Sequence, residues 1–489
     1  MSTDLGLQSH YPPLIGGKFR AITDASFPAV DAATGEQLAT ISRGGKAEVD
    51  AAVAAAKAAF PAWAATRPED RAKLLLRVAD WLEENAQRLT LIDAHDIGRT
   101  VFEIPQDYRS AIGQYRFFAA AILTHDGYNH AVPGGWAIAK REPFGVVGQI
   151  IPWNVPAIMA SYKLAPALAA GNTVVLKPDE NASLSTLELT RQLAEIFPPG
   201  VVNVVPGYGD EAGAALTAHP DVRKLAFTGS PQIGRLVAHA GAERLIPVSL
   251  ELGGKSPNIV FPDIDDIDAV VDNATFASTF CNGQSCLAGT RLFLHDDIYP
   301  AFMEKLVKAY ESIRIGSPLD PETRLGCLVS EKQGLRVLDY IESGTSQANL
   351  ATGGSRVKVE GNDHGWFVEP TIFETSNDSR IAQEEIFGPV LSVIRWNDFD
   401  TMIEQANDVV YGLASGVYTS NLRNAMRTAD RLQAGQVWVN QYVNLLDGSP
   451  FGGFKESGLG REVGKDALEM YTQLKSIMFA EQVPPPFYV

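Results

Sequence analysis

Residues 280–291 read FCNGQSCLAGTR and place two of the chain's three cysteines, Cys281 and Cys286, among small side chains. Three chemistries suit such a pair: a metal site, a disulfide and a nucleophilic thiol. Zinc needs four ligands in tight pairs, and the sequence offers neither a second pair nor a nearby histidine, so we expect no metal. A disulfide would be unusual in a long chain with so few cysteines.

Local features leave the choice between a buried thiol and a nucleophile open. Free cysteines are most often small core residues. This suits Cys281, which follows Phe280 at the end of an apolar helical pattern, ATFASTF. Cys286 differs because the preceding NGQS places it in a turn, and loops carry binding and catalytic residues more often than cores do.

Three glycine motifs are candidates for phosphate binding. GYGDEAG (207–213) and GLGREVG (458–464) each have one residue too many for the dinucleotide signature. FTGSPQIG (227–234) is better placed, because KLAFT is typical of a strand and PQIGRLVAHA of the helix after it. A pyrophosphate can bind at such a helix N-terminus, where free N–H groups and the dipole favour anions.

A series of short β-branched runs would position these residues. From about residue 145 the runs are GVVGQII, TVVLKP, VVNVVPG, KLAFTGS, PVSLELGG and PNIVF, and helical patterns separate the first five. The alternation indicates parallel βαβ units covered on both faces. Ligands bind beyond the carboxyl ends of such strands, and Asn154, Lys177, Gly229 and Glu251 lie at those ends.

A second alternating series follows the cysteines: TRLFLH, YPAFMEKLVKAYESI, PVLSVIRW, FDTMIEQAND, LASGVYT, NAMRTADRLQ and QVWVN. It predicts a second α/β domain over roughly residues 254–456. Before residue 100, AEVDAAVAAAKAAF and PEDRAKLLLRVADWLEENAQRL are helical patterns. We therefore predict an α/β fold with two doubly wound parallel-sheet domains.

Composition bounds the class of protein. A chain of 489 residues is too long to fold around one small hydrophobic core. Its content of 45% hydrophobic and 20% charged residues is typical of a soluble globular protein. The net charge of −17 argues against nucleic acid and against an anionic membrane as partners. The N-terminal MSTDLGLQSHYPP lacks the pattern of a secretion signal, and no apolar run reaches the ~18 residues of a membrane span. We expect a reducing, cytoplasmic location.

Seven short motifs occur along the chain in this order: PWN (152–154), KPDE (177–180), FTGSPQIG (227–234), LELGGKSPN (250–258), NGQSC (282–286), EEIFGPV (384–390) and PFGGFKESGLGRE (450–462). Together they resemble the NAD(P)-dependent aldehyde dehydrogenase superfamily, in its hydrolytic branch. The similarity runs from IGGKF (15–19) to YTQLKS (471–476). It implies an enzyme that oxidises an aldehyde to the carboxylic acid.

The resemblance resolves the choice between the two thiols. By the family pattern GQ-x-C, Cys286 is the nucleophile that adds to the aldehyde carbonyl, and Cys281 has no assigned role. The side-chain amide of Asn154 and the backbone N–H of Cys286 would stabilise the oxyanion of the thiohemiacetal. Glu251 would activate the water that hydrolyses the thioester. Glu462 either relays protons or forms a plain ion pair, and this choice stays open.

The resemblance also implies a set of contacts with NAD. They are Trp153, Lys177, Glu180, Gly229, Ser230, Gly234, Glu385 and Phe387. Ser230 would face the pyrophosphate, and Glu385 would bind the nicotinamide ribose. Trp153 and Phe387 would border the nicotinamide, although core packing alone would also explain two aromatic residues.

Glu180 favours NAD over NADP. Its carboxylate would accept hydrogen bonds from both hydroxyls of the adenosine ribose and would repel a 2′-phosphate. Lys177 acts in the opposite direction, because its amine can reach that phosphate. We expect NAD as the cofactor, with NADP less favoured.

By the same resemblance the substrate tunnel is lined by Val155, Met159, Tyr162, Phe280, Ser285, Leu287, Val443, Leu445 and Phe451. None of these is an arginine or a lysine, and a carboxylated aldehyde would need a cationic anchor. We therefore expect an uncharged aliphatic or aromatic aldehyde as substrate.

Two other functions remain as alternatives. A dehydrogenase that passes the thioester to coenzyme A would lack the base, so Glu251 favours hydrolysis. A catalytically retired structural or binding homologue would be expected to lose Cys286, Glu251 or Asn154, and all three are present.

The resemblance finally implies a division of the chain and its assembly. We predict an NAD-binding domain of residues 1–123 and 143–253, followed by the catalytic domain. Residues 124–142 and 471–489 resemble segments through which family members exchange strands between subunits. We therefore expect a homo-oligomer, either a dimer or a tetramer.

Overall fold

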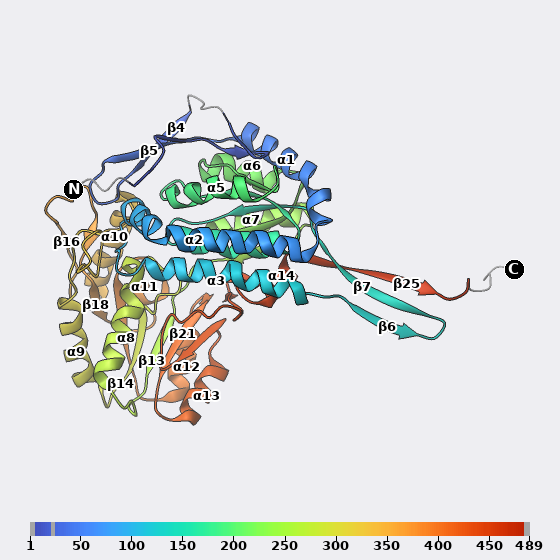
Figure 1. Cartoon of the computed structure of the whole chain (residues 1–489). Coiled ribbons are helices and arrows are strands. Elements are labelled where there is room, and N and C mark those ends of the chain that lie inside the picture. Colours follow the sequence, from blue (N-terminus) through green and yellow to red (C-terminus); the bar gives the residue numbers. More distant parts are fainter. Residues whose placement is uncertain (1–4, 21–24, 484–489) are drawn as a thin grey trace.

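The computed structural model describes residues 5–20 and 25–483. Residues 1–4 and 21–24 of the predicted NAD-binding domain, and residues 484–489 of the predicted oligomerisation segment, lie outside the described residues. Figure 1 shows two layered α/β bodies, one above the other, and a long β arm that projects to one side.

The first sheet contains the strands predicted between residues 145 and 251. Its order is β24 (Gly458–Leu459), β12 (Val248–Glu251), β11 (Val222–Thr228), β8 (Val146–Ile150), β9 (Thr173–Lys177), β10 (Val202–Val204), β2 (Leu14–Ile15) and β3 (Lys18–Phe19). Strands β12 to β10 pair in parallel, with Ile150 opposite Lys177 and Thr228 opposite Glu251. The strand ends that carry the predicted site residues therefore meet at one edge.

Helices cover both faces of this sheet. On one face lie α2 (Pro68–Ile97), α3 (Pro105–Ala121), α4 (Pro156–Ala169) and α5 (Leu184–Ile196), and on the other lie α1 (Lys46–Ala64), α6 (Ala214–Ala218) and α7 (Pro231–Arg244). Neighbouring residues of β9 alternate between the two apolar clusters, with Val174 in one and Val175 in the other. This is the arrangement of a doubly wound sheet.

The first two helices extend beyond their predicted ends. The pattern AEVDAAVAAAKAAF ends at Phe60, but α1 continues through Pro61 to Ala64. Trp63 is buried there against Phe197, with ring centroids 5.7 Å apart, and this packing offsets the hydrogen bond that Pro61 removes. Helix α2 runs on to Ile97, where Gly98 ends it in the left-handed conformation with φ 81°.

The second sheet contains the later strand series. Its order is β15 (Asn349–Thr352), β18 (Thr371–Glu374), β19 (Val390–Trp396), β14 (Arg291–His295), β13 (Pro257–Val260), β21 (Ala414–Tyr418) and β22 (Gln436–Val439). Only β15 is antiparallel to its neighbour among these strands of the described chain. Helices α8 (Ile267–Thr279) and α9 (Tyr299–Glu311) pack on one face, and α10 (Glu331–Gln347) and α12 (Phe399–Asn407) on the other.

Shorter elements complete the chain. They are β1 (His10–Tyr11), β4 (Ser26–Val30), β5 (Gln37–Ser42), β16 (Arg356–Val357), β17 (Phe367–Val368), α11 (Arg380–Gln383), β20 (Tyr411–Gly412), α13 (Leu422–Arg431), β23 (Phe454–Lys455) and α14 (Lys465–Met470). Together the two parallel-sheet layers confirm the predicted α/β fold class. Along the described ranges, no helix combines the length and apolar character needed to cross a membrane.

The projecting arm is an antiparallel sheet of β6 (Tyr128–Val132), β7 (Gly135–Pro143) and β25 (Thr472–Ala480). Strand β25 pairs with β7 over its whole length, from Thr472 opposite Pro143 to Ala480 opposite Gly135. Before it reaches the arm, the chain returns from the second sheet to the first, where β24 pairs with β12. The last part of the sequence therefore joins both layers and the arm.

Candidate active site

A cleft of about 460 Å³ opens where the carboxyl ends of the first sheet face the second layer. Its walls include Trp153, Asn154, Thr228, Gly229, Ser230, Leu252 and Gly253 from the first layer, and Cys286, Ser330, Gln333, Arg336, Glu385, Phe387 and Tyr411 from the second. The predicted nucleophile and many of the predicted cofactor contacts therefore share one cavity.

The cysteine loop has an unusual backbone. Cys281 and Asn282 adopt left-handed conformations with φ 55° and 56°, followed by Gly283 with φ 71°. Side chains other than glycine rarely occupy this region. A Cβ on Gly283 would lie 2.2 Å from the carbonyl carbon of Gly388, so the close approach also requires glycine. The turn carries Cys286 out of the core into the cleft, whereas Cys281 is buried.

Hydrogen bonds hold this loop in place. The Asn282 amide donates to the carbonyls of Gly98 (3.0 Å) and Cys327 (2.8 Å), and its oxygen accepts from the Gly326 N–H (2.8 Å). The Gln284 side chain accepts from the backbone N–H of Val329 at 3.1 Å. These bonds offset the strain of consecutive left-handed residues.

Asn154 is buried beside this loop. Its Nδ2 donates one hydrogen to the Gln284 carbonyl at 2.9 Å. An amide carries a second N–H hydrogen, which is available for an oxyanion near Cys286. The loop and the proposed oxyanion donor are thus directly connected.

The electrostatics of Cys286 favour its protonated form. Burial raises the pKa of its thiol, and the carboxylates of Glu385 and Glu251 raise it further. The backbone N–H groups of Cys286 and Leu287 act in the opposite direction, because they stabilise the thiolate. Such a thiol reacts slowly until a nearby base takes its proton.

Glu251 ends β12 and is buried. Neither of its carboxylate oxygens has a hydrogen-bond partner within the described part of the chain. Burial and the neighbouring Glu462 raise the pKa of Glu251 well above its ordinary value. Glu462 itself forms a buried ion pair with Lys163 at 2.7 Å, which is one of the two roles that the sequence left open.

Glu385 and two aromatic rings, Trp153 from the first layer and Phe387 from the second, line the cleft. Glu385 Oε1 accepts from the Gly254 N–H at 3.0 Å, and burial raises the pKa of its carboxyl to about 7. Trp153 and Phe387 meet edge to face, with centroids 5.4 Å apart. Their rings form part of the cavity wall.

Lys177 and Glu180 lie together at the end of β9. Lys177 Nζ contacts Glu180 Oε2 at 3.0 Å, and the lysine is buried while the carboxylate is partly exposed. Neither side chain is among the residues that line the described cleft, whereas their neighbour Asn181 is. The pair therefore sits beside the cavity.

The glycines of the FTGSPQIG motif have mostly structural contacts. Ser230 caps α7, where its oxygen accepts from the Ile233 N–H at 3.4 Å. Gly229 donates its N–H to the Glu251 carbonyl at 3.1 Å, so this donor is already used. Gly234 lies outside the described cleft wall, and a Cβ there would meet Leu252 at 2.5 Å. Its requirement for glycine is explained by helix packing.

Eight of the nine predicted tunnel residues belong to one apolar cluster that packs against Cys286, and the ninth, Ser285, is a buried polar residue outside it. The buried members of the cluster include Met159, Tyr162, Leu287 and Phe451, and its partly buried members include Val155, Phe280, Val443, Leu445 and Cys286 itself. The rings of Tyr162 and Phe451 lie 6.5 Å apart. Cys286 thus lines the polar cleft and also packs against this apolar cluster.

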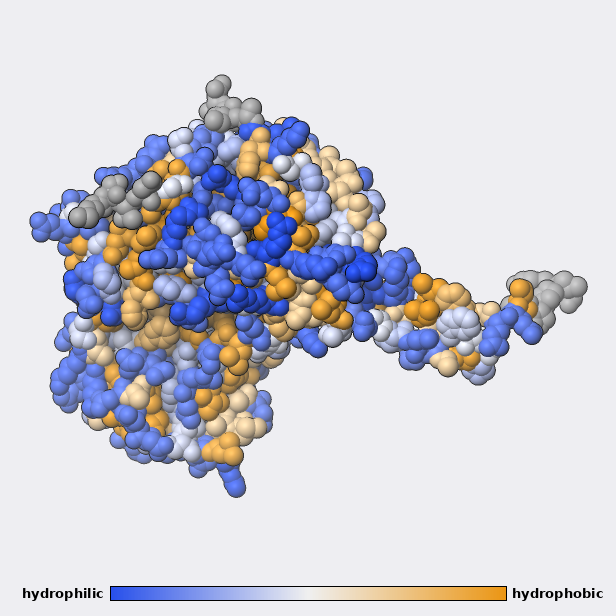
Figure 2. Space-filling view, viewed as in Figure 1, coloured by the Kyte–Doolittle hydropathy of each residue, from blue (hydrophilic) through white to orange (hydrophobic). Residues whose placement is uncertain are grey.

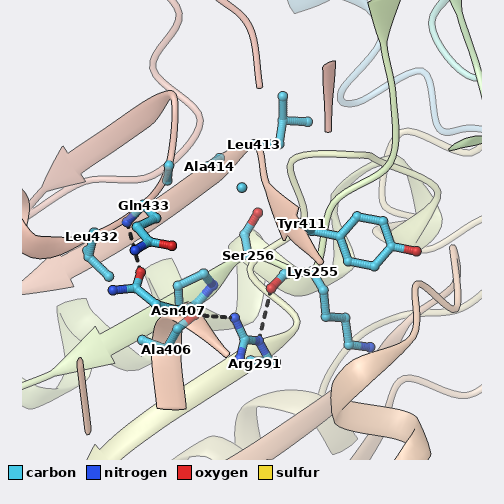
Figure 3. Close-up of a pocket in the computed structure, with 13 residues that line it drawn as sticks. Lys255, Ser256, Arg291, Ala406, Asn407, Tyr411, Leu413, Ala414, Leu432 and Gln433 are labelled. Atoms are coloured by element: carbon cyan, nitrogen blue, oxygen red, sulfur yellow. Dashed lines mark hydrogen bonds between the residues drawn. The ribbon is translucent and has the colours of Figure 1, made fainter. Parts of the chain in front are cut away.

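A second, much smaller cavity lies behind Tyr411, which borders both cavities (Figure 3). Arg291 is buried there and donates to the Lys255 carbonyl at 2.9 Å and to the Ala406 carbonyl at 2.7 Å. The volume of about 10 Å³ has room for one water at most. It supports the cleft wall and cannot admit a substrate.

Sequence reasoning missed several residues of the site. Helix α10 contributes Gln333 and Arg336 to the cleft wall. A cluster of three ionisable residues, Arg99, Glu103 and Asp107, contacts the cysteine loop through the bond from the Cys281 N–H to Glu103. The four-residue spacing of these three ionisable residues was a visible signal, but nothing local showed that they approach the loop.

The chain was compared with known proteins. The Aldehyde dehydrogenase family matches residues 19–477. Hydroxyisobutyraldehyde dehydrogenase of Mycolicibacterium austroafricanum is 43% identical over 98% of this chain and 95% of the relative.

Two solved structures are similar to this chain over almost their whole length. Gamma-glutamyl-gamma-aminobutyraldehyde dehydrogenase from Burkholderia cenocepacia has 43% identity and a TM-score of 0.95, covering 98% of each chain. A cysteine-to-alanine mutant of P. syringae indole-3-acetaldehyde dehydrogenase, in complex with NAD+ and IAA, has 39% identity and a TM-score of 0.94, covering 97% of each chain.

The matches extend over almost the whole chain and over the fold described above. They agree with the family that the motifs predicted. The protein is a member of the aldehyde dehydrogenase family.

Proposed function

We propose that this chain oxidises an aldehyde to the carboxylic acid with NAD, and that Cys286 is its nucleophile. One observation carries the proposal. Cys286 lines the polar cleft and also packs against the apolar cluster, so a carbonyl held by that cluster and a cofactor held in the cleft would both be within reach of the thiol.

The first step joins substrate and protein. The Cys286 thiolate adds to the carbonyl carbon, a C–S bond forms, and the carbonyl electron pair moves to oxygen. The free N–H hydrogen of Asn154 and the backbone N–H of Cys286 stabilise that oxyanion. Because the pKa of the thiol is raised, its proton must first leave, and Glu251 is the nearby carboxylate suited to accept it.

The cleft fits a nicotinamide dinucleotide. Its partly buried Glu385 carboxylate can accept from ribose hydroxyls, and Trp153 and Phe387 offer an apolar wall for the ring. The first turn of α7 presents N–H groups to a pyrophosphate, and exposed Ile233 on that turn offers apolar surface to a base. When bound, NAD accepts the hydride that leaves the substrate carbon.

The last step releases the acid from the thioester on Cys286. The proton that Glu251 took from the thiol first passes to solvent, and Glu251 then takes a proton from water. The hydroxide adds to the thioester carbon, the C–S bond breaks, and the Cys286 sulfur leaves as a thiolate that regains a proton from Glu251. A carboxylate whose pKa is raised by burial is a stronger base than one in water. Its two oxygens have no competing partner in the described residues, which favours hydrolysis over transfer to coenzyme A.

The test is substitution of each cysteine. Cys286→Ala should abolish NADH formation from propanal while NAD binding, measured by calorimetry, stays within about twofold. Cys281→Ala is the matched control and should keep most activity, because its buried thiol does not line the cleft. Loss of activity in Cys281→Ala alone would show that the wrong thiol was chosen. Coenzyme A should have no effect on product formation.

We further propose an uncharged aliphatic or aromatic aldehyde as substrate. The predicted tunnel residues in the cluster beside Cys286 are apolar or aromatic, and none of the nine predicted tunnel residues is an arginine or a lysine. Among the similar proteins, one name indicates a small hydroxy-aldehyde and another an aromatic acetaldehyde. A panel of aldehydes assayed by NADH absorbance would rank the classes. A preference for carboxylated aldehydes would contradict the proposal.

We also propose a homo-oligomer that assembles through the arm. Large apolar side chains are exposed along it, including Tyr128, Trp136, Leu474 and Met478, the last with 81% exposed. Figure 2 shows hydrophobic residues interspersed with hydrophilic ones on the projecting arm. Apolar surface of this kind, next to the free edge of β6, favours pairing with another chain. Light scattering should give a dimeric or tetrameric mass, and a monomer at micromolar concentration would contradict this.

We retain the cytoplasm as the proposed location. The three cysteines are free in the structure, and a thiol nucleophile works best in a reducing compartment.

A further inference from the structure

Arg99 follows the end of α2 and is one of the most deeply buried charged residues of the described chain. Its guanidinium makes three kinds of contact. Nε lies 3.1 Å from Glu103 Oε1, and Nη1 lies 2.5 Å from Asp107 Oδ2. Nη1 also donates to the backbone carbonyl of Asn154 at 3.2 Å.

Glu103 continues this chain of contacts into the cysteine loop. Its second oxygen, Oε2, accepts the backbone N–H of Cys281 at 2.8 Å. Cys281 is the first of the left-handed residues of the turn that ends at Cys286. One guanidinium is therefore connected on one side to Asn154 and on the other, through one carboxylate, to the loop of the nucleophile.

These contacts join the two groups that must act on the same carbonyl. The thiol attacks the carbon while the amide of Asn154 stabilises the oxygen, so their separation has to be fixed to a fraction of an ångström. The planar fork of arginine suits this task, because it fixes the directions of its N–H bonds. A lysine has the same charge but fixes none of these directions.

An arginine ion pair can serve stability alone, and Arg88 provides that comparison. It lies on α2, is partly exposed, and also contacts a carboxylate and a carbonyl, Glu188 Oε2 at 2.8 Å and the Leu5 oxygen at 3.2 Å. None of its hydrogen-bond partners belongs to the cleft. Arg99 differs because its network ends at the backbone of Asn154 and at the backbone of the loop that carries Cys286.

We propose that Arg99, acting through Glu103, is a positioning residue that sets the distance between Cys286 and Asn154 for the addition to the aldehyde. The inference rests on the proposed function of Cys286. It concerns the acylation step, and it leaves hydrolysis of the thioester to Glu251.

The experiment measures the two half-reactions separately. The rate of the NADH burst with propanal, normalised to active sites titrated by the burst amplitude, reports acylation, and decay of the acyl-enzyme followed by intact mass reports hydrolysis. Arg99→Lys should slow the burst about 10- to 100-fold. It should change the hydrolysis rate and NAD affinity by less than about twofold. Arg88→Lys is the matched control, and its burst rate should equal the wild-type rate even if its melting temperature falls.

Glu103→Gln provides a second, milder variant. The two bonds of Glu103 use its two oxygens, and in glutamine one of these is replaced by an NH2 group that faces a donor, so the burst should slow several-fold in a protein that keeps its fold. Wild-type burst rates in both variants would overturn the proposal, as would equal slowing of both half-reactions. If Arg99→Lys does not fold, Glu103→Gln decides by the same criterion. A burst that persists in Cys286→Ala would instead disprove the proposed function.

Discussion

The nucleophile and the base of the proposed site are held in opposite ways. The loop that carries Cys286 is fixed by side-chain hydrogen bonds of Asn282 and Gln284, despite its left-handed backbone. Glu251 ends a regular strand that pairs with β11 along its length and with β24 at Leu250 and Glu251, yet its carboxylate has no hydrogen-bond partner among the described residues. One group has a strained backbone and a fixed position, and the other has a relaxed backbone and a free side chain.

The difference matches the two half-reactions. Addition to the carbonyl needs the thiol at one distance from the oxyanion donors, so a rigid loop favours it. Glu251 is proposed to act on the thiol first and on water later, at two different places. A carboxylate without a fixed partner can serve both, and its raised pKa makes its ionised form a stronger base.

Removal of the proposed base, Glu251, should have the largest effect on turnover, and it should separate acylation from hydrolysis most clearly. In Glu251→Gln, steady-state turnover should fall about 100- to 1000-fold, because the amide cannot take a proton from water. A burst of NADH should remain, and acyl-enzyme should accumulate in the intact mass spectrum. Turnover at the wild-type rate would remove Glu251 from the mechanism. A burst slowed as much as turnover would show that Glu251 acts mainly on the thiol.

Weakening the loop is expected to have the next largest effect. Asn282→Ala removes three buried hydrogen bonds and places alanine at φ 56°, so unfolding free energy should fall by about 2–4 kcal/mol. The burst should slow about tenfold. Denaturant unfolding and stopped-flow absorbance measure the two changes. Asn273→Ala, which removes one exposed bond to Ala269, is the control and should change stability by less than about 1 kcal/mol.

Glu385, a carboxylate with one hydrogen-bonded oxygen, is intermediate between the bonded loop of Cys286 and the unbonded carboxylate of Glu251. Glu385 has one oxygen bonded to the Gly254 N–H and a pKa raised to about 7. Below pH 7 it is protonated and loses an acceptor for ribose hydroxyls, so kcat/KM for NAD should fall by up to tenfold per pH unit as the pH decreases. It should be level above about pH 8. In Glu385→Gln this dependence should vanish, and an unchanged profile in the variant would assign the titration to another group.

The ion-paired carboxylate of Glu180 should give the smallest effect. We expect the wild type to prefer NAD over NADP, and Glu180→Ser to reduce that preference about tenfold, since the repulsion removed is on the order of a kcal/mol. Lys177, 3.0 Å away, stays to attract the 2′-phosphate. The measurement is kcat/KM for both cofactors at saturating aldehyde. A wild type that prefers NADP, or an unchanged ratio, would show that Glu180 does not select the cofactor.

The sequence predicted the elements better than their contacts. Strands β8 to β12 are short β-branched runs between helical patterns, and this local signal placed them and the fold class correctly. The motifs placed Cys286, Asn154 and Glu385 in one cleft. The roles proposed for these residues, and the division into domains, stay predictions.

Contacts between distant segments had no such signal. Arg99 approaches Asn154 and the cysteine loop only because α2 and α3 pack under the first sheet, which no spacing encodes. Gly234 shows the converse case, since its motif suggested a phosphate contact whereas its neighbour is Leu252. Strand β24 has two residues, too few for a periodic pattern, yet it completes the edge of the first sheet.

The late position of β24 has a consequence for synthesis of the protein. The ribosome completes the whole second sheet before it makes Gly458 and Leu459, so the β24 side of Leu250 and Glu251 stays unpaired on the nascent chain while residues 252–457 are made. Unpaired strand edges are where growing chains aggregate. The proposed base therefore lies on a sheet edge that closes late in synthesis, and closure of that edge waits for residues 458–459.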